Sequence, residues 1–99
     1  MEESMFQRLV TAEKRLKEID EELMSEDVMK NLAHFKEISK ERAYLEPQVA
    51  AFKRYQKNEE DIEAAKEMAH DDDPDLAEMG REELYKYLYN RKHIEGGII

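Results

Sequence analysis

The stretch LAHFKEISKERAYLEPQVAAFKRYQKNEEDIEAAKEMA, residues 32–69, decides the fold, because its apolar side chains recur at helical spacing along most of its length. Pro47 interrupts it, since proline removes the N–H that would bond the carbonyl of Ala43 and its ring crowds that carbonyl. Val49 and Phe52 resume the same apolar stripe beyond the proline. We therefore predict one long helix with a kink at Pro47, and a complete break there is the alternative.

The segment before this helix carries the strongest periodic signal of the chain. Its apolar residues alternate in steps of four and three, which is the heptad spacing of a helix packed along one seam: Met5, Leu9, Ala12, Leu16, Ile19 and Leu23. Ser4 followed by Gln7 fits a capping box at the helix start. We predict a helix over residues 4–24, and then a short turn around Val28 and Met29, with Asn31 capping the long helix.

A third helix is predicted after the acidic run at residues 71–73. Asp73 is a capping residue, and Pro74 suits the first helical position, where its missing N–H costs nothing. Gly96 and Gly97 are expected to end this helix. Its apolar face is expected to comprise Leu76, Met79, Leu84, Tyr87 and Leu88.

The helix lengths suggest the architecture. The two outer helices would each span roughly 30 Å, and the middle helix is close to their sum. Short connections favour antiparallel neighbours, so the first helix should lie along the first half of the middle helix and the third along its second half. The predicted fold class is all-α, an elongated three-helix antiparallel bundle or coiled-coil hairpin with a long kinked central helix. Residues 1–95 would form the helical domain and residues 96–99 a C-terminal stub.

Composition narrows the possible functions. Charged residues make up 41% of the chain and the formal net charge is -9, which disfavours nucleic-acid binding by the whole surface but leaves room for a local basic strip. The sequence has no cysteine, no apolar run long enough to span a bilayer and no secretory signal peptide. We expect a cytoplasmic protein without membrane association.

No motif in the sequence indicates an active site. His34, His70 and His93 are far apart, and the aspartates around Asp73 lack the alternation and turn glycine of a calcium loop. The glutamates of residues 59–67 are expected to form a solvated face. We predict no catalytic residues, no cofactor, no metal and no small-molecule substrate.

One local basic patch stands out from this acidic background. Lys53, Arg54 and Lys57 lie beside Tyr55, and a basic and aromatic cluster on a helix can contact RNA phosphates or an acidic protein. They are the candidate partner-contact residues. The alternative is an ordinary exposed helix surface without a partner, which can have the same residue pattern. Tyr85 and Tyr89 share a face further on and are expected to be half-buried packing residues.

The order of these segments resembles the N-terminal helical domain of bacterial peptide chain release factors, most closely release factor one, the factor for UAA and UAG. An opening helix, FQRLVTAEKRLKEIDEELMSEDVMK, precedes the long segment, and an acidic gap leads to DPDLAEMGREEL. The most similar pieces are SKERAYL at residues 39–45, the Glu46-Pro47 step, and Tyr55 with residues 59–62. The resemblance covers roughly residues 5–84, and the sequence YKYLYNRKHIEGGII departs from the family pattern after Leu84.

The resemblance implies a helical interaction domain that lies toward the ribosomal stalk base, near its protein and rRNA. In the family, the codon-reading tripeptide and the Gly-Gly-Gln motif lie further along, and neither occurs in these residues. The implied function is therefore that of a non-enzymatic module in translation termination, monomeric when isolated. The alternative is a free-standing coiled-coil adaptor that dimerises through the seam of the first helix.

Overall fold

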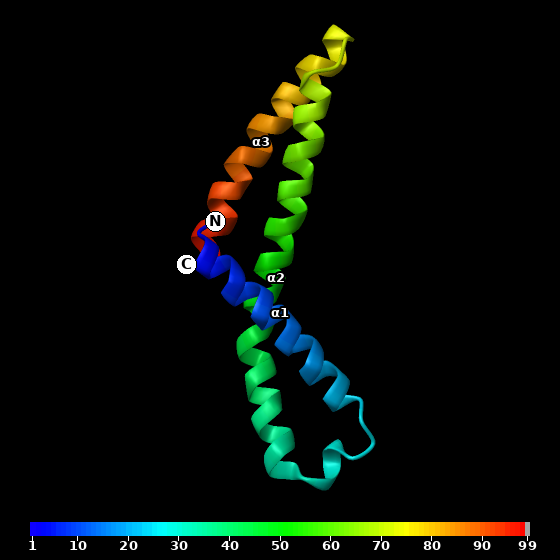
Figure 1. Ribbon diagram of the computed structural model, residues 1–99, viewed down its shortest axis with the longest axis vertical. Helices are drawn as coiled ribbons and strands as arrows, with labels where there is room; N and C mark the ends of the chain where they lie inside the picture. The colour runs from blue at the N-terminus through cyan, green and yellow to red at the C-terminus, as the bar shows by residue number, and fades with distance from the viewer. Residues whose placement is uncertain (99) are drawn as a thin grey trace. The chain divides into compact units, whose positions relative to one another are not determined.

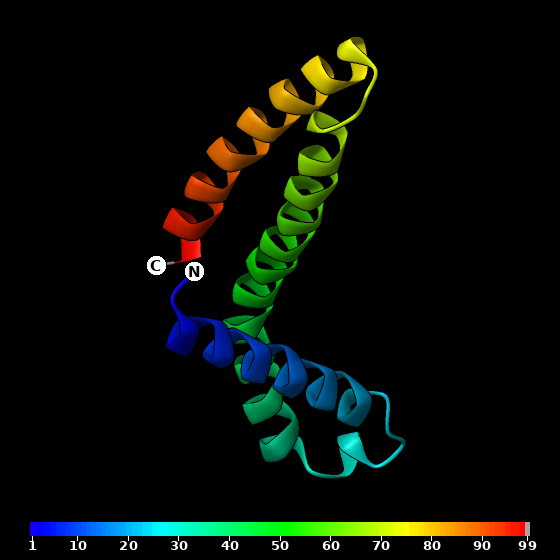
Figure 2. The same ribbon diagram turned by 45° about the horizontal axis from the view of Figure 1, so that its top comes forward.

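The computed structural model describes residues 1–98, which form three long α-helices and one short 3₁₀ helix: α1 (Glu3–Leu23), η1 (Val28–Lys30), α2 (Leu32–Ala69) and α3 (Pro74–Ile98). The all-α prediction is confirmed, since the described part of the chain contains no strand. The chain divides into two compact units, Met1–Ala50 and Ala51–Ile99. Each unit is a helical hairpin, α1 with the first part of α2 and the second part of α2 with α3 (Figures 1 and 2).

The start of α1 differs from the predicted capping box. The capping residue is Glu2, whose carboxylate accepts a hydrogen bond from the Ser4 amide at 3.2 Å. Gln7 donates to Glu3 at 3.0 Å instead of reaching back to the cap. The prediction was wrong because a carboxylate two residues before Ser4 can take the same orphan amide, and a negative charge is further favoured at a helix N-terminus.

The middle of the predicted α1 seam is buried. Leu9 and Ile19 are fully buried and Ala12 nearly so, while Met5, Leu16 and Leu23 keep intermediate exposure. Each fully buried aliphatic side chain contributes about 1.5–3 kcal/mol relative to an exposed one. These side chains are therefore buried within the chain itself.

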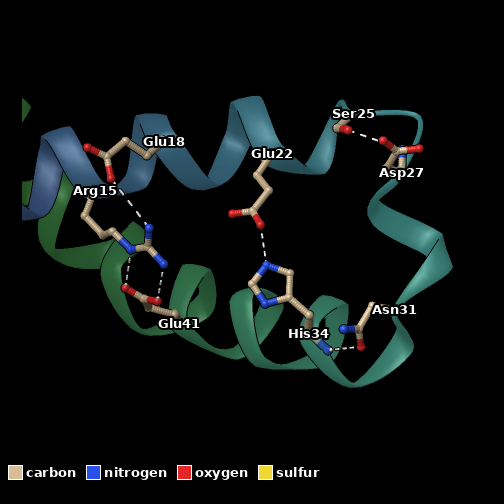
Figure 3. Close-up of polar contacts among 8 residues, drawn as sticks. All are labelled: Arg15, Glu18, Glu22, Ser25, Asp27, Asn31, His34 and Glu41. Atoms are coloured by element: carbon tan, nitrogen blue, oxygen red, sulfur yellow. Dashed lines mark hydrogen bonds and ion pairs between the residues drawn. The ribbon is translucent and has the colours of Figure 1, made fainter.

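Three polar contacts join α1 to α2 in the first unit, and Figure 3 shows two of them, Arg15–Glu41 and Glu22–His34. Arg15 binds Glu41 through two hydrogen bonds of 2.7 and 2.8 Å. Arg42 binds Asp20 at 2.7 Å, and Glu22 contacts His34. From Arg15–Glu41 to Glu22–His34 the residue numbers rise on α1 and fall on α2, as expected for an antiparallel pair.

The connection between these helices follows the prediction. Val28 lies in the 3₁₀ turn η1, and the Ser25 hydroxyl accepts a hydrogen bond from the Asp27 amide. Asn31 caps α2, because its side-chain oxygen accepts the His34 amide at 3.1 Å (Figure 3).

Helix α2 runs without a break through Pro47, as predicted. The proline is exposed, so its ring lies on the outer side of the helix. The kink at this position stays a prediction. Buried positions continue beyond it at Val49, Ala51, Phe52 and Tyr55.

The second unit closes through a short turn, where Asp73 caps α3 as predicted. Its carboxylate accepts the Asp75 amide at 2.9 Å. Gly80 explains why α3 can approach the end of α2 so closely: a Cβ on this glycine would lie 2.4 Å from the Ala69 nitrogen and 2.6 Å from the Met68 carbonyl carbon. Only a residue without a side chain fits against that backbone.

The end of α3 lies later than the sequence suggests. The helix continues through Gly96 and Gly97 to Ile98, and both glycines keep negative φ angles. The prediction that they end the helix was wrong, because glycine makes a helix less favourable by about 1 kcal/mol without forbidding it.

Candidate interaction groove

The three predicted contact residues lie together on the rim of one groove in the second unit. Lys53, Arg54 and Lys57 are exposed side chains of α2. The groove has a volume of about 370 Å³, is wide open to solvent and continues onto α3, its remaining lining residues being Asn58, Asp61, Tyr87, Asn90 and Ile94. The volume falls in the range of small-molecule sites, but an open shape without enclosing walls suits the surface of a macromolecule better.

The three cations differ in their pairing. Lys57 binds Asp61 at 3.1 Å, and this hydrogen bond raises the pKa of Lys57. Within residues 1–98, Lys53 and Arg54 have no carboxylate partner. Their charges are therefore available to a ligand, in a chain whose Arg15, Arg42 and Arg91 are all held by carboxylates.

A buried amide forms the floor of the groove. Asn58 is 5% exposed and its side-chain nitrogen donates to the Tyr87 carbonyl oxygen at 2.9 Å. A buried polar group of this kind costs free energy unless it is bonded, so we expect the contact to favour one register of α3 on α2. Tyr87, whose backbone accepts this bond, also lines the groove.

Contacts to carboxylates hold two other side chains of α3, Arg91 and Tyr87. Arg91 on α3 binds Glu59 on α2 through hydrogen bonds of 2.7 and 2.9 Å, a bidentate geometry. The Tyr87 phenol is hydrogen-bonded to Glu83, which raises the pKa of Tyr87. The groove therefore presents two unpaired cations and an aromatic ring.

The sequence analysis identified the three cations of the groove but not its other lining residues. Tyr87 had been assigned to the apolar face, and Asn58, Asn90 and Ile94 had no assigned role. A usable signal existed for Asn58: it falls between Tyr55 and Ile62 in three-four spacing, which is a seam position occupied by an amide.

The predicted face of α3 was partly wrong. Leu76, Met79 and Leu88 are between 41% and 51% exposed, whereas Ala77 is 8% exposed and Gly80 is buried. Tyr85 and Tyr89 are 78% and 62% exposed, so they are not the half-buried packing residues expected. Near the turn only small residues fit in the buried stripe, because the two backbones approach closely there. The two tyrosines lie on the outer side of α3, away from this stripe.

The three histidines make separate contacts. His34 contacts Glu22, His70 bonds the Lys66 carbonyl at 2.7 Å, and the His93 ring lies 4.5 Å from that of Tyr89. Across residues 1–98 no three His, Cys, Asp or Glu side chains gather where they could hold a metal ion. In the same part of the chain, no helix is both long and apolar enough to cross a membrane.

Comparison with known protein families gives a match. Residues 12–97 match the family model of the PCRF domain, the N-terminal domain of peptide chain release factors, whose members interact with the ribosome in translation termination. The match continues past Leu84 into the segment that appeared to depart from the family. In this family the domain itself is non-catalytic, although the whole factor triggers hydrolysis. No solved structure matches the chain significantly.

Proposed function

This chain belongs to the PCRF family of release-factor N-terminal domains, and we propose that it docks its factor on the ribosome through the groove rimmed by Lys53, Arg54 and Lys57. The partner would be the stalk base, its protein and its rRNA. The observation that carries the proposal is the pair of unpartnered cations, Lys53 and Arg54, on the rim of an open groove in a chain of net charge -9. We further propose a factor of the release factor one type, on the resemblance of residues 5–84.

The physical case rests on local charge. Phosphates and acidic side chains are repelled by an acidic surface at long range, so productive contact requires a place where cations are not neutralised internally. Contacts to RNA phosphates release counterions, which makes binding fall steeply with salt. The groove residues would thus set both the affinity and its salt dependence.

The test is binding of the labelled 99-residue chain to ribosomes over a range of salt concentrations. The variant Lys53→Glu/Arg54→Glu/Lys57→Glu should bind more weakly and should lower the slope of log affinity against log salt by about 2–3. A matched control, Lys14→Glu/Lys36→Glu/Lys40→Glu, makes the same change in net charge at exposed lysines of the first unit. Circular dichroism would establish that both variants keep their helices.

Two results would contradict the proposal. One is wild-type affinity and salt slope in the groove variant; the other is an equal loss in the control, which would mean that only net charge matters.

We also propose that residues 1–95 act as one monomeric domain in the cytoplasm, followed by the short segment 96–99. Burial of Leu9 and Ile19 within the chain supports this over the dimeric adaptor. Sedimentation at micromolar concentration separates the two, because the adaptor requires a stable dimer.

A further inference from the structure

The outer face of α3 carries a row of exposed rings that the groove does not use. Tyr85, Tyr89 and His93 follow one another at intervals of four residues, so they lie one above the other, about 6 Å apart along the helix axis. Tyr85 is 78% exposed and Tyr89 62%. The Tyr89 and His93 rings are tilted by 59°, so they do not stack flat on one another.

Two lysines flank these rings. Lys86 and Lys92 are exposed and, within residues 1–98, neither forms an ion pair; the Lys86 amine lies 5.4 Å from the centre of the Tyr87 ring. No acidic residue occurs between Glu83 and Glu95. This part of α3 is therefore locally basic in an acidic chain.

Burial explains why the rings point outward. The seam of α3 takes Ala77, Gly80, Leu84 and Tyr87, in steps of three and four, and the salt-bridged Arg91 continues it. Positions 85, 89 and 93 fall outside that seam. Large aromatic side chains kept in water without a packing role indicate a binding surface.

We propose that this α3 aromatic face, comprising Tyr85, Lys86, Tyr89, Lys92 and His93, binds single-stranded RNA. Aromatic rings stack on unpaired bases of any sequence, while lysines meet the phosphates. Duplex RNA hides its base faces, so a row of rings favours a single strand. The proposal deepens the ribosomal role proposed above and rests on it for the setting in which RNA is met.

An acidic protein is the competing partner, since lysines would attract carboxylates as well. The rings decide for RNA: an acidic peptide offers no flat surface to stack on them, whereas each nucleotide supplies a base and a phosphate together.

The experiment measures fluorescence anisotropy of a labelled single-stranded RNA of mixed sequence, and of the matching duplex, with the 99-residue chain at low salt. The single strand should bind more tightly than the duplex. Tyr85→Ala/Tyr89→Ala should weaken single-strand binding at least about tenfold. Tyr85→Phe/Tyr89→Phe keeps the rings and should retain most of the affinity.

Tyr44→Ala is the matched control, because Tyr44 is 71% exposed and lies in the first unit. It should bind as wild type, and circular dichroism confirms that each variant is folded. The proposal is overturned if the wild-type chain shows no preference for the single strand, if Tyr85→Ala/Tyr89→Ala binds unchanged, or if polyglutamate competes as well as RNA does.

The outcome is separable from that of the groove. The RNA assay contains no ribosome, and the variant Lys53→Glu/Arg54→Glu/Lys57→Glu leaves the rings in place. If Lys53→Glu/Arg54→Glu/Lys57→Glu binds ribosomes as wild type does, only the groove proposal is overturned. If Tyr85→Ala/Tyr89→Ala binds single-stranded RNA as wild type does, only the present proposal is overturned.

Discussion

The two units are built on the same helix α2, and each is a hairpin with an arginine–glutamate pair between its helices, Arg15–Glu41 in the first and Arg91–Glu59 in the second. Their seams differ. The first unit packs the aliphatic side chains of α1, whereas the second brings backbones together at Gly80 and places an amide, Asn58, in its seam. One long helix can therefore support two packing solutions along its length.

The two units should differ in how well they tolerate amino-acid substitutions. Charged contacts between half-exposed side chains can shift or be replaced by water, so each contributes little. A backbone contact at Gly80 and a buried hydrogen bond at Asn58 have no such freedom. We expect the second unit, which carries both proposed surfaces, to be the less tolerant of substitution.

The largest effect is expected for Gly80→Ala. The new Cβ would meet backbone atoms of Met68 and Ala69 at 2.4–2.9 Å, and backbone cannot rotate aside as a side chain can. The free energy of unfolding should fall by about 1–3 kcal/mol, the usual cost of overpacking, despite the better helix propensity of alanine. Urea unfolding followed by circular dichroism measures it, and hydrogen exchange should accelerate in the second unit first.

Gly96→Ala is the control for this variant. A Cβ there meets nothing within 4 Å, and the residue is helical. This change should leave stability unchanged or raise it by up to about 1 kcal/mol. Equal effects at the two glycines would remove the close approach as the explanation.

An intermediate effect is expected for Asn58→Ala, which deletes the hydrogen bond to the Tyr87 carbonyl. The free energy of unfolding should fall by about 1 kcal/mol relative to Asn90→Ala, since both changes add the same helix propensity. Asn90 lines the same groove and makes no hydrogen bond through its side chain within residues 1–98. If the two variants are equally stable, the amide does not fix the register.

The smallest effect is expected in the first unit and depends on pH. The hydrogen bonds from Arg15 lower the pKa of Glu41, so the ionised carboxylate stabilises the folded state. This contribution is present above the pKa of an unfolded glutamate, about 4.3, and is lost as the pH falls through the lower folded value. Glu41→Gln should thus be less stable than wild type at pH 7 and approach it in acid.

Urea unfolding at several pH values tests this. A gap between wild type and Glu41→Gln that stays constant from neutral to strongly acidic pH would show that the pair contributes through packing rather than charge.

Local sequence features predicted the helices well, and failed where a distant residue competed. The heptad seam of α1 and the caps at Asn31 and Asp73 depend on neighbours within one or two turns, so they could be identified from the sequence. The cap at Glu2 was missed because several acceptors compete for one amide. The face of α3 was misassigned because Leu76 and Met79 are more apolar than Ala77 and Gly80, yet only the small residues fit against α2.

The candidate groove was half predictable. Lys53, Arg54 and Lys57 lie within five consecutive residues, and their clustering needs only one helix. Tyr87 lines the same groove although it lies 30 positions after Lys57, on the other helix of the second hairpin. No local pattern encodes that meeting.

The sequence by itself determined the helical fold class, the positions of most helix starts and the basic cluster, because propensity, capping and charge act between near neighbours. Only the tertiary structure decided which tyrosines face water, why residue 80 is glycine and which α3 side chains complete the groove. Those outcomes depend on how closely two helices approach, and that distance is set by the small residues and the buried amide that meet between them.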